Sequence, residues 1–317
     1  MRHIRFSAIA LLLACAFPTL ASAAVKEIGV TYVKSPLNVP AIVEMKLGLF
    51  EKEFGPDGIT VTHLDLNAGP KQTQAIAAGS VQFANCLGNT SALLAAVGGV
   101  DLKIIGIFSR APEAFTIIAK APGIASVRDL KGKKVVGPKG TLLHQLLIAA
   151  LAKEGLKAAD VEFLSMGLME GVTAMLAGSA DAALAAGAAV PKAQEQGARI
   201  LATGKGLLDA STVIAVGGQF LKEHPDLVAR FMKVHKGALA FMKENEREAL
   251  RLTAEETGLT PEAVSAMYPL YDFDVTIRPS DIDDLRKTQE FLIENGMMEK
   301  RVDIDSLVVS IDAGNAK

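Results

Sequence analysis

Short apolar runs alternate along the chain with segments in which apolar side chains recur every three or four residues. The short runs have the length and β-branched content of strands, and the longer segments have helical periodicity and stop near glycines. In the first part of the chain the predicted strands are residues 26–31, 59–66, 81–86 and 102–108, and the predicted helices 41–47, 71–78 and 90–96. This order is typical of an α/β unit whose mainly parallel sheet is covered by helices on both sides.

A second unit of the same kind begins near Phe115. Its predicted strands are 134–137, 161–164, 182–186 and 199–202, and its predicted helices 142–154 and 171–177. Residues 212–217 form one more strand-like run, which we expect to return to the first unit. After Pro225 the pattern is helical, over 227–243, 246–257, 261–267 and 282–295.

Chain length favours two lobes, because about 294 residues after the leader exceed the usual size of a single core. We predict a first lobe of residues 24–110 with 215–317 and a second lobe of 111–214. Two crossings, near 109–115 and 207–216, would join them.

The first 23 residues have the three parts of a secretion signal. Arg2 and Arg5 supply the positive end, an apolar run follows, and Ala21-Ser22-Ala23 fits a signal peptidase, so we expect a periplasmic protein that begins at Ala24. A rival interpretation takes Leu12-Leu13-Ala14-Cys15 as a lipoprotein box, in which Cys15 would carry a lipid anchor.

Composition narrows the function classes. The full chain has 33 lysines and arginines against 35 acidic residues, and losing Arg2 and Arg5 leaves a net charge of about −4 with no basic block, which argues against a nucleic-acid partner. Cys86 is the one cysteine outside the leader, so we expect no internal disulfide and no cysteine-rich metal site. We also expect no cofactor.

Three glycine-containing turns lie between a predicted strand and a predicted helix. They are Asn67-Ala68-Gly69-Pro70, Gly88-Asn89-Thr90-Ser91 and Gly137-Pro138-Lys139-Gly140-Thr141. In open α/β sheets such turns lie at the carboxyl edge, where unpaired amides of helix starts favour an anion. Each turn is also a common structural feature, so the prediction of a site rests on their joint placement.

Several individual side chains admit both a binding and a structural interpretation. Arg110 follows a strand end and could hold a carboxylate or sulfonate with two hydrogen bonds, or be a surface charge near the hinge. Lys34 could add a positive charge or be solvated, and His144 could donate to an anion or cap its helix. Asn38 and Asn89 suit both ligand contacts and turns.

The order of several segments makes a family resemblance specific. Lys46-Leu47-Gly48-Leu49-Phe50-Glu51, Ala77-Ala78-Gly79-Ser80-Val81-Gln82-Phe83, Val127-Arg128-Asp129-Leu130-Lys131-Gly132 and Leu176-Ala177-Gly178-Ser179-Ala180-Asp181 occur in that order. From about Ile28 to Glu294, the chain resembles the substrate-binding proteins of ABC importers for sulfonates, taurine, nitrate and thiamine precursors, the NMT1/THI5-like group.

The resemblance implies a type II periplasmic-binding fold, with two lobes and a ligand cleft between them. It also implies a monomer that captures a small organic anion, of sulfonate or carboxylate type, and delivers it to an inner-membrane ABC permease. By position in the family, the candidate ligand-binding residues are Lys34, Ser35, Asn38, Gly69, Pro70, Gly88, Asn89, Thr90, Ser91, Ser109, Arg110, Gly140, Thr141 and His144.

One departure bears on the solute. Asp181-Ala182 leads into an alanine-rich stretch where members for sulfonates and related solutes usually have aromatic residues, and the chain has no tryptophan, so taurine and nitrate are less favoured. Alternatives that stay open are a nitrate or thiamine-precursor receptor and a partner of a membrane sensor. An enzyme of the pyrimidine-synthase type is disfavoured because no paired nucleophile and base, and no metal-spaced histidines, are evident.

Overall fold

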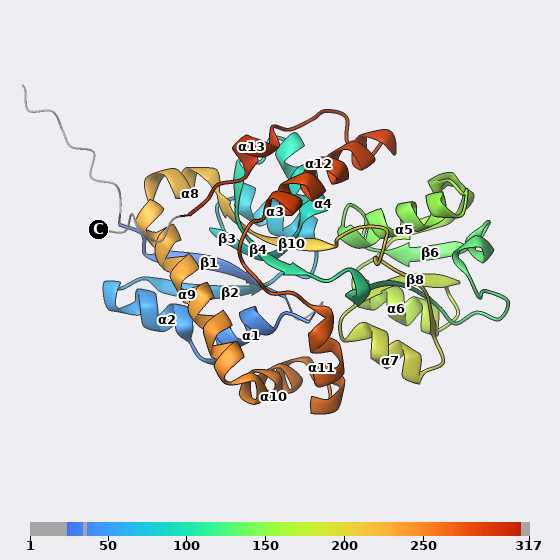
Figure 1. Ribbon diagram of the computed structural model, residues 1–317, viewed down its shortest axis with the longest axis horizontal. Helices are drawn as coiled ribbons and strands as arrows, with labels where there is room; N and C mark the ends of the chain where they lie inside the picture. Colours follow the sequence, from blue (N-terminus) through green and yellow to red (C-terminus); the bar gives the residue numbers. More distant parts are fainter. Residues whose placement is uncertain (1–23, 34–36, 312–317) are drawn as a thin grey trace, which may run out of the picture.

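The computed structural model describes residues 24–33 and 37–311, which form two lobes side by side (Figure 1). The first sheet has the strand order β2-β1-β3-β10-β4, and the second β7-β6-β8-β5-β9. The strands are β1 Glu27–Tyr32, β2 Thr60–Asp65, β3 Phe83–Gly88, β4 Leu102–Arg110, β5 Phe115–Ala119, β6 Lys134–Gly137, β7 Glu162–Ser165, β8 Ala182–Ala186, β9 Arg199–Thr203 and β10 Ser211–Gly217. This is the α/β architecture that the alternating pattern predicts, and the leader and Lys34 to Pro36 lie outside the described residues.

Both sheets mix parallel and antiparallel pairs. In the first sheet β1 is parallel to β2 and β3, while β10 is antiparallel to β3 and β4. In the second sheet β6 is parallel to β7 and β8, while β5 is antiparallel to β8 and β9. One strand of each sheet therefore runs against the other four, so the sheets are mainly parallel in strand direction although half of their pairings are antiparallel.

The helices connect and cover these strands. They are α1 Val39–Lys46, α2 Leu49–Phe54, α3 Gly69–Ala77, α4 Asn89–Val97, α5 Leu142–Lys153, α6 Leu168–Leu176, α7 Ala189–Glu195, α8 Gly218–Glu223, α9 Pro225–Glu244, α10 Glu246–Thr257, α11 Pro261–Met267, α12 Pro279–Glu294 and α13 Ile304–Leu307. Sequence patterns missed α2, α7 and α8, each only six or seven residues long, because a helix of under two turns shows little periodicity. None of the helices in the described part of the chain is long and apolar enough to cross a membrane.

The chain passes between the sheets twice, after β4 and after β9. The second crossing ends earlier than the sequence pattern suggested, since β10 begins at Ser211, which pairs with Arg110 of β4. Residues 211–214 therefore belong to the first sheet, whereas the predicted boundary at residue 215 gave them to the second lobe. Ala210, just before β10, has a φ of 50°, a left-handed conformation that is rare for a residue with a Cβ.

Aromatic stacking ties the C-terminal segment to the first sheet. Phe231 of α9 stacks on Phe83 of β3 with ring centroids 3.8 Å apart, and on Phe50 of α2 at 4.6 Å. All three rings are fully buried, and each contributes about 1.5–3 kcal/mol by leaving water. This packing explains why the helices from α9 onward lie across the first lobe rather than forming a third one (Figure 1).

Candidate functional site

Four helices begin in the space between the two sheets. In the first lobe α3 follows β2 and α4 follows β3, and in the second lobe α5 follows β6 and α6 follows β7. The first-turn amides of a helix have no intrahelical acceptor and carry the positive end of the helix dipole. Both sheets thus direct positive helix ends toward the same region, at the carboxyl ends of parallel strands.

An inner cavity of about 60 Å³ lies among these helix starts, with walls from both lobes. The first lobe contributes Val33, Asn67, Ala68, Gly69, Gln72, Cys86, Gly88, Ser91 and Thr212, and the second contributes Phe115, Pro138, Thr141, Leu142, Leu143, Leu168 and Ala186. None of these lining residues is acidic or basic. The wall instead offers hydroxyl and amide groups together with apolar side chains, among them Phe115 and three leucines.

A larger outer cavity of about 640 Å³ adjoins the inner one and shares Asn67, Ala68, Pro138 and Leu168 with it. Its further lining residues are Asp65, Leu66, Pro70, Lys71, Lys139, Ser165, Met166, Gly167, Met169, Glu170, Ala188, Lys192 and Thr257. Charged side chains thus line the outer cavity and are missing from the walls of the inner one.

Five of the residues singled out from the sequence line these cavities. Gly69, Gly88, Ser91 and Thr141 line the inner cavity, and Pro70 lines the outer one. Gly69 is a glycine for a steric reason, because a Cβ there would lie 2.2 Å from Ser91 Oγ. The absence of a Cβ at Gly69 therefore lets the start of α3 lie close to Ser91 of α4.

Four other candidates form hydrogen bonds within the walls. Asn38 Oδ1 accepts from Cys86 Sγ at 3.0 Å, and Asn89 Nδ2 donates to Asp284 at 2.8 Å. Ser109 shares a 2.8 Å hydrogen bond with Thr212, which itself lines the inner cavity. The Thr90 hydroxyl donates to Gln145 across the lobes. These four side chains support the walls rather than lining the cavities.

A second hydrogen bond joins the lobes at the same place. Ser91 Oγ, on α4 of the first lobe, donates to the carbonyl oxygen of Gly140 in the second lobe at 2.9 Å. Gly140, another candidate from the sequence, therefore contacts the opposite lobe through its backbone. Its φ of 72° is one that residues with a side chain rarely adopt.

Arg110 does not face the cleft, contrary to the interpretation that it could hold an anionic solute. Its guanidinium donates twice to Asp281, at 2.7 and 2.6 Å, once to Asp272, and once each to the carbonyl oxygens of Asp274 and Thr276. A guanidinium has five N–H groups, so these five bonds use all of its donors. Arg110 is also not a free surface charge, since its side chain is only 12% exposed and ties the first crossing to the C-terminal segment.

His144 lies behind the cleft rather than in it. Its ring stacks on Phe163 with centroids 4.6 Å apart, and its Nδ1 accepts a long 3.4 Å contact from the Gly140 amide. Burial, with a smaller effect of nearby Lys139, lowers the pKa of this imidazole to about 4. His144 is thus a neutral structural histidine near the start of α5. Lys34 and Ser35, the remaining candidates, lie outside the described residues.

Sequence reasoning missed several residues of the inner wall. Gln72 lies one turn into α3, Leu168 begins α6, and Thr212 follows the second crossing. Gln72 and Thr212 are almost fully buried, and their sequence neighbours look like those of any helix or strand. That Leu168 lies in the cleft wall could have been predicted only from the general rule that helices after parallel strands begin at the carboxyl edge of the sheet.

Cys86 combines burial, strain and a place in the inner wall. Its φ of 60° is unusual for a residue with a side chain, and such strain collects at functional sites. Burial raises the pKa of the thiol to about 12. The thiol donates to the amide oxygen of Asn38, so it is neither ionised nor paired with a base.

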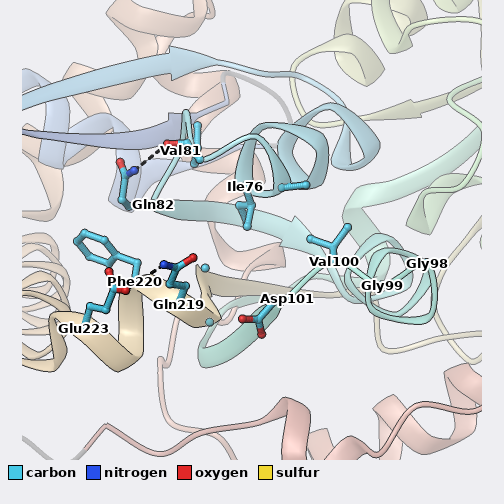
Figure 2. Close-up of a pocket in the computed structure, with 14 residues that line it drawn as sticks. Ile76, Val81, Gln82, Gly98, Gly99, Val100, Asp101, Gln219, Phe220 and Glu223 are labelled. Atoms are coloured by element: carbon cyan, nitrogen blue, oxygen red, sulfur yellow. Dashed lines mark hydrogen bonds between the residues drawn. The ribbon is translucent and has the colours of Figure 1, made fainter.

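A separate pocket of about 610 Å³ lies at the far end of the first sheet (Figure 2). Val81, Val100 and Asp101, which precede β3 and β4, line it together with the ends of α3 and α4 and the start of α8. Two polar side chains shown there are already paired, since Gln82 donates to Gly79 and Gln219 to Glu223. All of its lining residues belong to the first lobe, so this pocket is not part of the cleft.

Two lobes with mixed five-stranded sheets and a cleft at their carboxyl edges define the fold of periplasmic binding proteins. The chain belongs to the family described as NMT1/THI5 like, which matches residues 36–249. Fold and family thus agree with the resemblance drawn from the sequence.

Two similar proteins are named for binding sulfonates. A Bacillus subtilis (strain 168) protein named for binding aliphatic sulfonates is 29% identical over 289 residues, covering 89% of this chain and 85% of that protein. The alkanesulfonate-binding protein SsuA from Xanthomonas axonopodis pv. citri, solved bound to MOPS, superposes with a TM-score of 0.83. It is 24% identical and covers 91% of this chain and 100% of its own, a likeness that shows the fold alone.

The same fold also includes an enzyme. The structure of the desulfurization enzyme DSZB superposes with a TM-score of 0.65 at 15% identity, covering 92% of this chain and 98% of that one. Fold alone therefore does not separate a receptor from an enzyme.

Proposed function

We propose that the protein is the extracytoplasmic solute-binding component of an ABC importer and captures a small organic anion of the sulfonate or carboxylate type. The observation that carries this proposal is the convergence of the α3, α4, α5 and α6 starts on one cavity between the lobes. Helix starts can hold an anion without a charged side chain in direct contact. The names of the relatives support sulfonates within this class.

A small acidic head suits the inner cavity physically. The hydroxyls of Ser91 and Thr141 line it but already donate to the carbonyl oxygens of Gly140 and Pro138, so the donors left for sulfonate or carboxylate oxygens are the unpaired amides of the helix starts. Its volume of about 60 Å³ has room for an acidic group but not for a whole organic solute. The rest of the solute would extend into the outer cavity.

Binding to the mature protein, beginning at Ala24, tests the proposal. In a thermal-shift and calorimetric screen, alkanesulfonates and short carboxylates should stabilise the protein, by about 2.7 kcal/mol at 100 times the dissociation constant. Stabilisation by cations or sugars, without any by anions, would contradict the proposed class. Nitrate and pyrimidine precursors belong in the same panel, since they are the other solute classes that the family resemblance suggests.

The proposed role is non-catalytic. In the described part of the cleft the one thiol, Cys86, contacts an amide rather than a histidine or carboxylate, an arrangement that does not activate a nucleophile. Incubation with sulfonates and sulfinates, followed by analysis for released sulfite, tests this point. Release of sulfite at a rate that depends on the protein would make it an enzyme.

The proposal places the protein outside the cytoplasm as a monomer that meets an inner-membrane permease. The sequence of the leader supports export, with cleavage after Ala23 or lipidation at Cys15. Mass spectrometry of the mature N-terminus distinguishes a free protein from an anchored one. A membrane sensor is the alternative partner, and solute uptake by a strain lacking the gene separates transport from sensing.

A further inference from the structure

Lys71 and Lys139 face the outer cavity from opposite lobes. Lys71 is the third residue of α3 in the first lobe, and Lys139 precedes α5 in the second lobe. Neither side chain forms an ion pair or hydrogen bond within the described chain, in contrast to Lys46 and Arg230, which pair with carboxylates. The cavity is thus bordered by two free ammonium groups.

Both lysines lie near the positive end of a helix, Lys71 in the first turn of α3 and Lys139 two residues before Thr141, the N-cap of α5. The start of a helix carries a partial positive charge, so acidic residues are preferred there and cations are unfavourable. Cations near two helix starts that line one cavity go against this local preference, and such departures are expected at functional sites. A negative group located between the two lysines would remove the repulsion at both helix starts.

An apolar surface lies beside the same cavity. Leu66, Met166, Leu168 and Met169 line it, and Met169 is 52% exposed, so its side chain is accessible to a solute. Leu168 also lines the inner cavity. A hydrocarbon chain that begins at the inner cavity could therefore lie on this surface.

The other charges of the outer cavity do not cancel the two lysines. Asp65 and Glu170 also line it, and a third lysine, Lys192, donates to the carbonyl oxygen of Thr257 at 3.4 Å. Neither Asp65 nor Glu170 lies within ion-pair distance of Lys71 or Lys139 in the described chain. Three lysines against two acids leave this cavity with a net positive charge.

We infer that the solute is an organic dianion, whose first acidic group occupies the inner cavity and whose second acidic group lies between Lys71 and Lys139. A short hydrocarbon chain along Leu66, Leu168 and the two methionines would join the two groups. This inference rests on the proposed function and adds the second charge. The inference predicts that the protein binds an ω-carboxyl alkanesulfonate more tightly than a plain alkanesulfonate of equal length.

Matched solutes test the second charge by calorimetry at fixed ionic strength. Each linear alkane-1-sulfonate from propane to hexane is compared with the ω-sulfocarboxylate of the same carbon number, so that a carboxylate replaces the terminal methyl group. In the wild-type protein the dianion of the best length should bind at least about tenfold tighter than its partner. Charge removal in Lys71→Gln/Lys139→Gln should reduce this preference to less than about threefold.

The control variant is Lys120→Gln/Lys133→Gln, which removes two exposed lysines of the second lobe outside both cavities and should keep the full preference. Equal binding of monoanion and dianion at every length by the wild type overturns the inference while the proposed function stands. An undiminished preference in Lys71→Gln/Lys139→Gln overturns it as well. Failure of both solute series to bind overturns the inference, and the proposed function is contradicted with it if the short carboxylates of the thermal-shift screen also fail to bind.

Discussion

The guanidinium of Arg110 grips the carboxylate of Asp281 with two hydrogen bonds, from Nε at 2.7 Å and from Nη2 at 2.6 Å. The pair joins the end of β4, where the chain leaves the first lobe, to the first turn of α12. Asp281 is only 5% exposed, and its Oδ2 also accepts from the Arg278 amide. Arg110, which the sequence offered as a possible anion-binding residue, thus links the end of β4 to α12.

Replacing Arg110 by alanine should therefore affect stability and leave binding intact. We expect Arg110→Ala to lower the free energy of unfolding by about 3–5 kcal/mol, because Asp281 would stay buried without its partner. Solute affinity of the folded protein should change less than about threefold. Urea unfolding and calorimetry measure the two quantities.

Two further variants make this prediction sharper. The exposed Arg128, 3.3 Å from Glu154, is the matched surface control, and Arg128→Ala should cost less than about 1 kcal/mol. In a double-mutant cycle, Arg110→Ala/Asp281→Ala should cost less than the sum of the single changes. If Arg110→Ala lost solute binding while its stability stayed unchanged, Arg110 would be a solute-binding residue instead.

Gly88 offers a test of contact between the lobes. A Cβ at this position would lie 3.2–3.4 Å from the side chain of Leu142, which belongs to the opposite lobe. Gly88 has an ordinary φ of −61°, so alanine introduces no backbone strain. We expect Gly88→Ala to push the lobes apart and weaken solute binding about fivefold to thirtyfold, as measured by calorimetry.

The control for Gly88 is Gly237, in the middle of α9. A Cβ there meets no atom within 4 Å, so Gly237→Ala should raise stability by up to about 1 kcal/mol and leave affinity unchanged. Equal affinity of Gly88→Ala and the wild type would mean that Leu142 moves aside without cost.

Cys86 should be nearly inert toward thiol reagents. With a pKa of about 12, roughly one thiol in 10,000 is ionised at pH 8, against about a quarter of those in an unfolded chain. We expect DTNB to react at least about 100-fold more slowly with the native mature protein than with protein in 6 M guanidinium. Rapid native labelling would indicate that the cleft opens far enough to expose the β3 wall.

The parts of the site that the sequence revealed are those in which local backbone chemistry determines geometry. The glycine turns at Gly69 and Gly88 lie at the cleft because a turn between a strand and a helix can lie only at that edge of a parallel sheet. The role of Arg110 could not be read from the sequence, because its partner Asp281 is 171 residues away. Local pattern gives a side chain's position along a strand but not its distant neighbour.

The sequence likewise predicted the helices and strands that have a clear local pattern of apolar residues, and missed others. Long amphipathic helices such as α9 and α12 were evident, whereas β5 was missed as a strand although a unit boundary was expected near its first residue, Phe115. Its five residues are all buried between antiparallel neighbours, so they show no alternation of polar and apolar positions. Both sheets contain antiparallel pairs because β5 and β10, the strands that follow the two crossings, run against the other strands of their sheets.

Asp284 should make the protein less stable as the pH rises. Burial, reinforced by Asp209 and partly offset by the hydrogen bond from Asn89, raises the pKa of this carboxyl to about 6. Between about pH 4 and 6 the folded protein therefore keeps a proton that the unfolded chain has released. The free energy of unfolding that this proton contributes, at most about 3 kcal/mol, is present below about pH 4 and is lost as the pH rises to about 6.

Asp284→Asn stays neutral and can still accept from Asn89, so it should be more stable than the wild type at pH 7.5. Exposed Asp283→Asn should show no such gain in urea unfolding.

His144 should act in the opposite direction over the same pH range. Its pKa is lowered to about 4, so below pH 6.5 the unfolded chain takes up a proton that the folded protein refuses, and stability falls as the pH falls. In the wild type the two trends oppose each other. His144→Gln should therefore lose stability more steeply as the pH rises from 4 to 6.5, and Asp284→Asn should lose it more steeply as the pH falls. Only the slopes are compared, since His144→Gln also removes the stacking on Phe163. Identical slopes in the two variants would mean that neither group carries a shifted pKa.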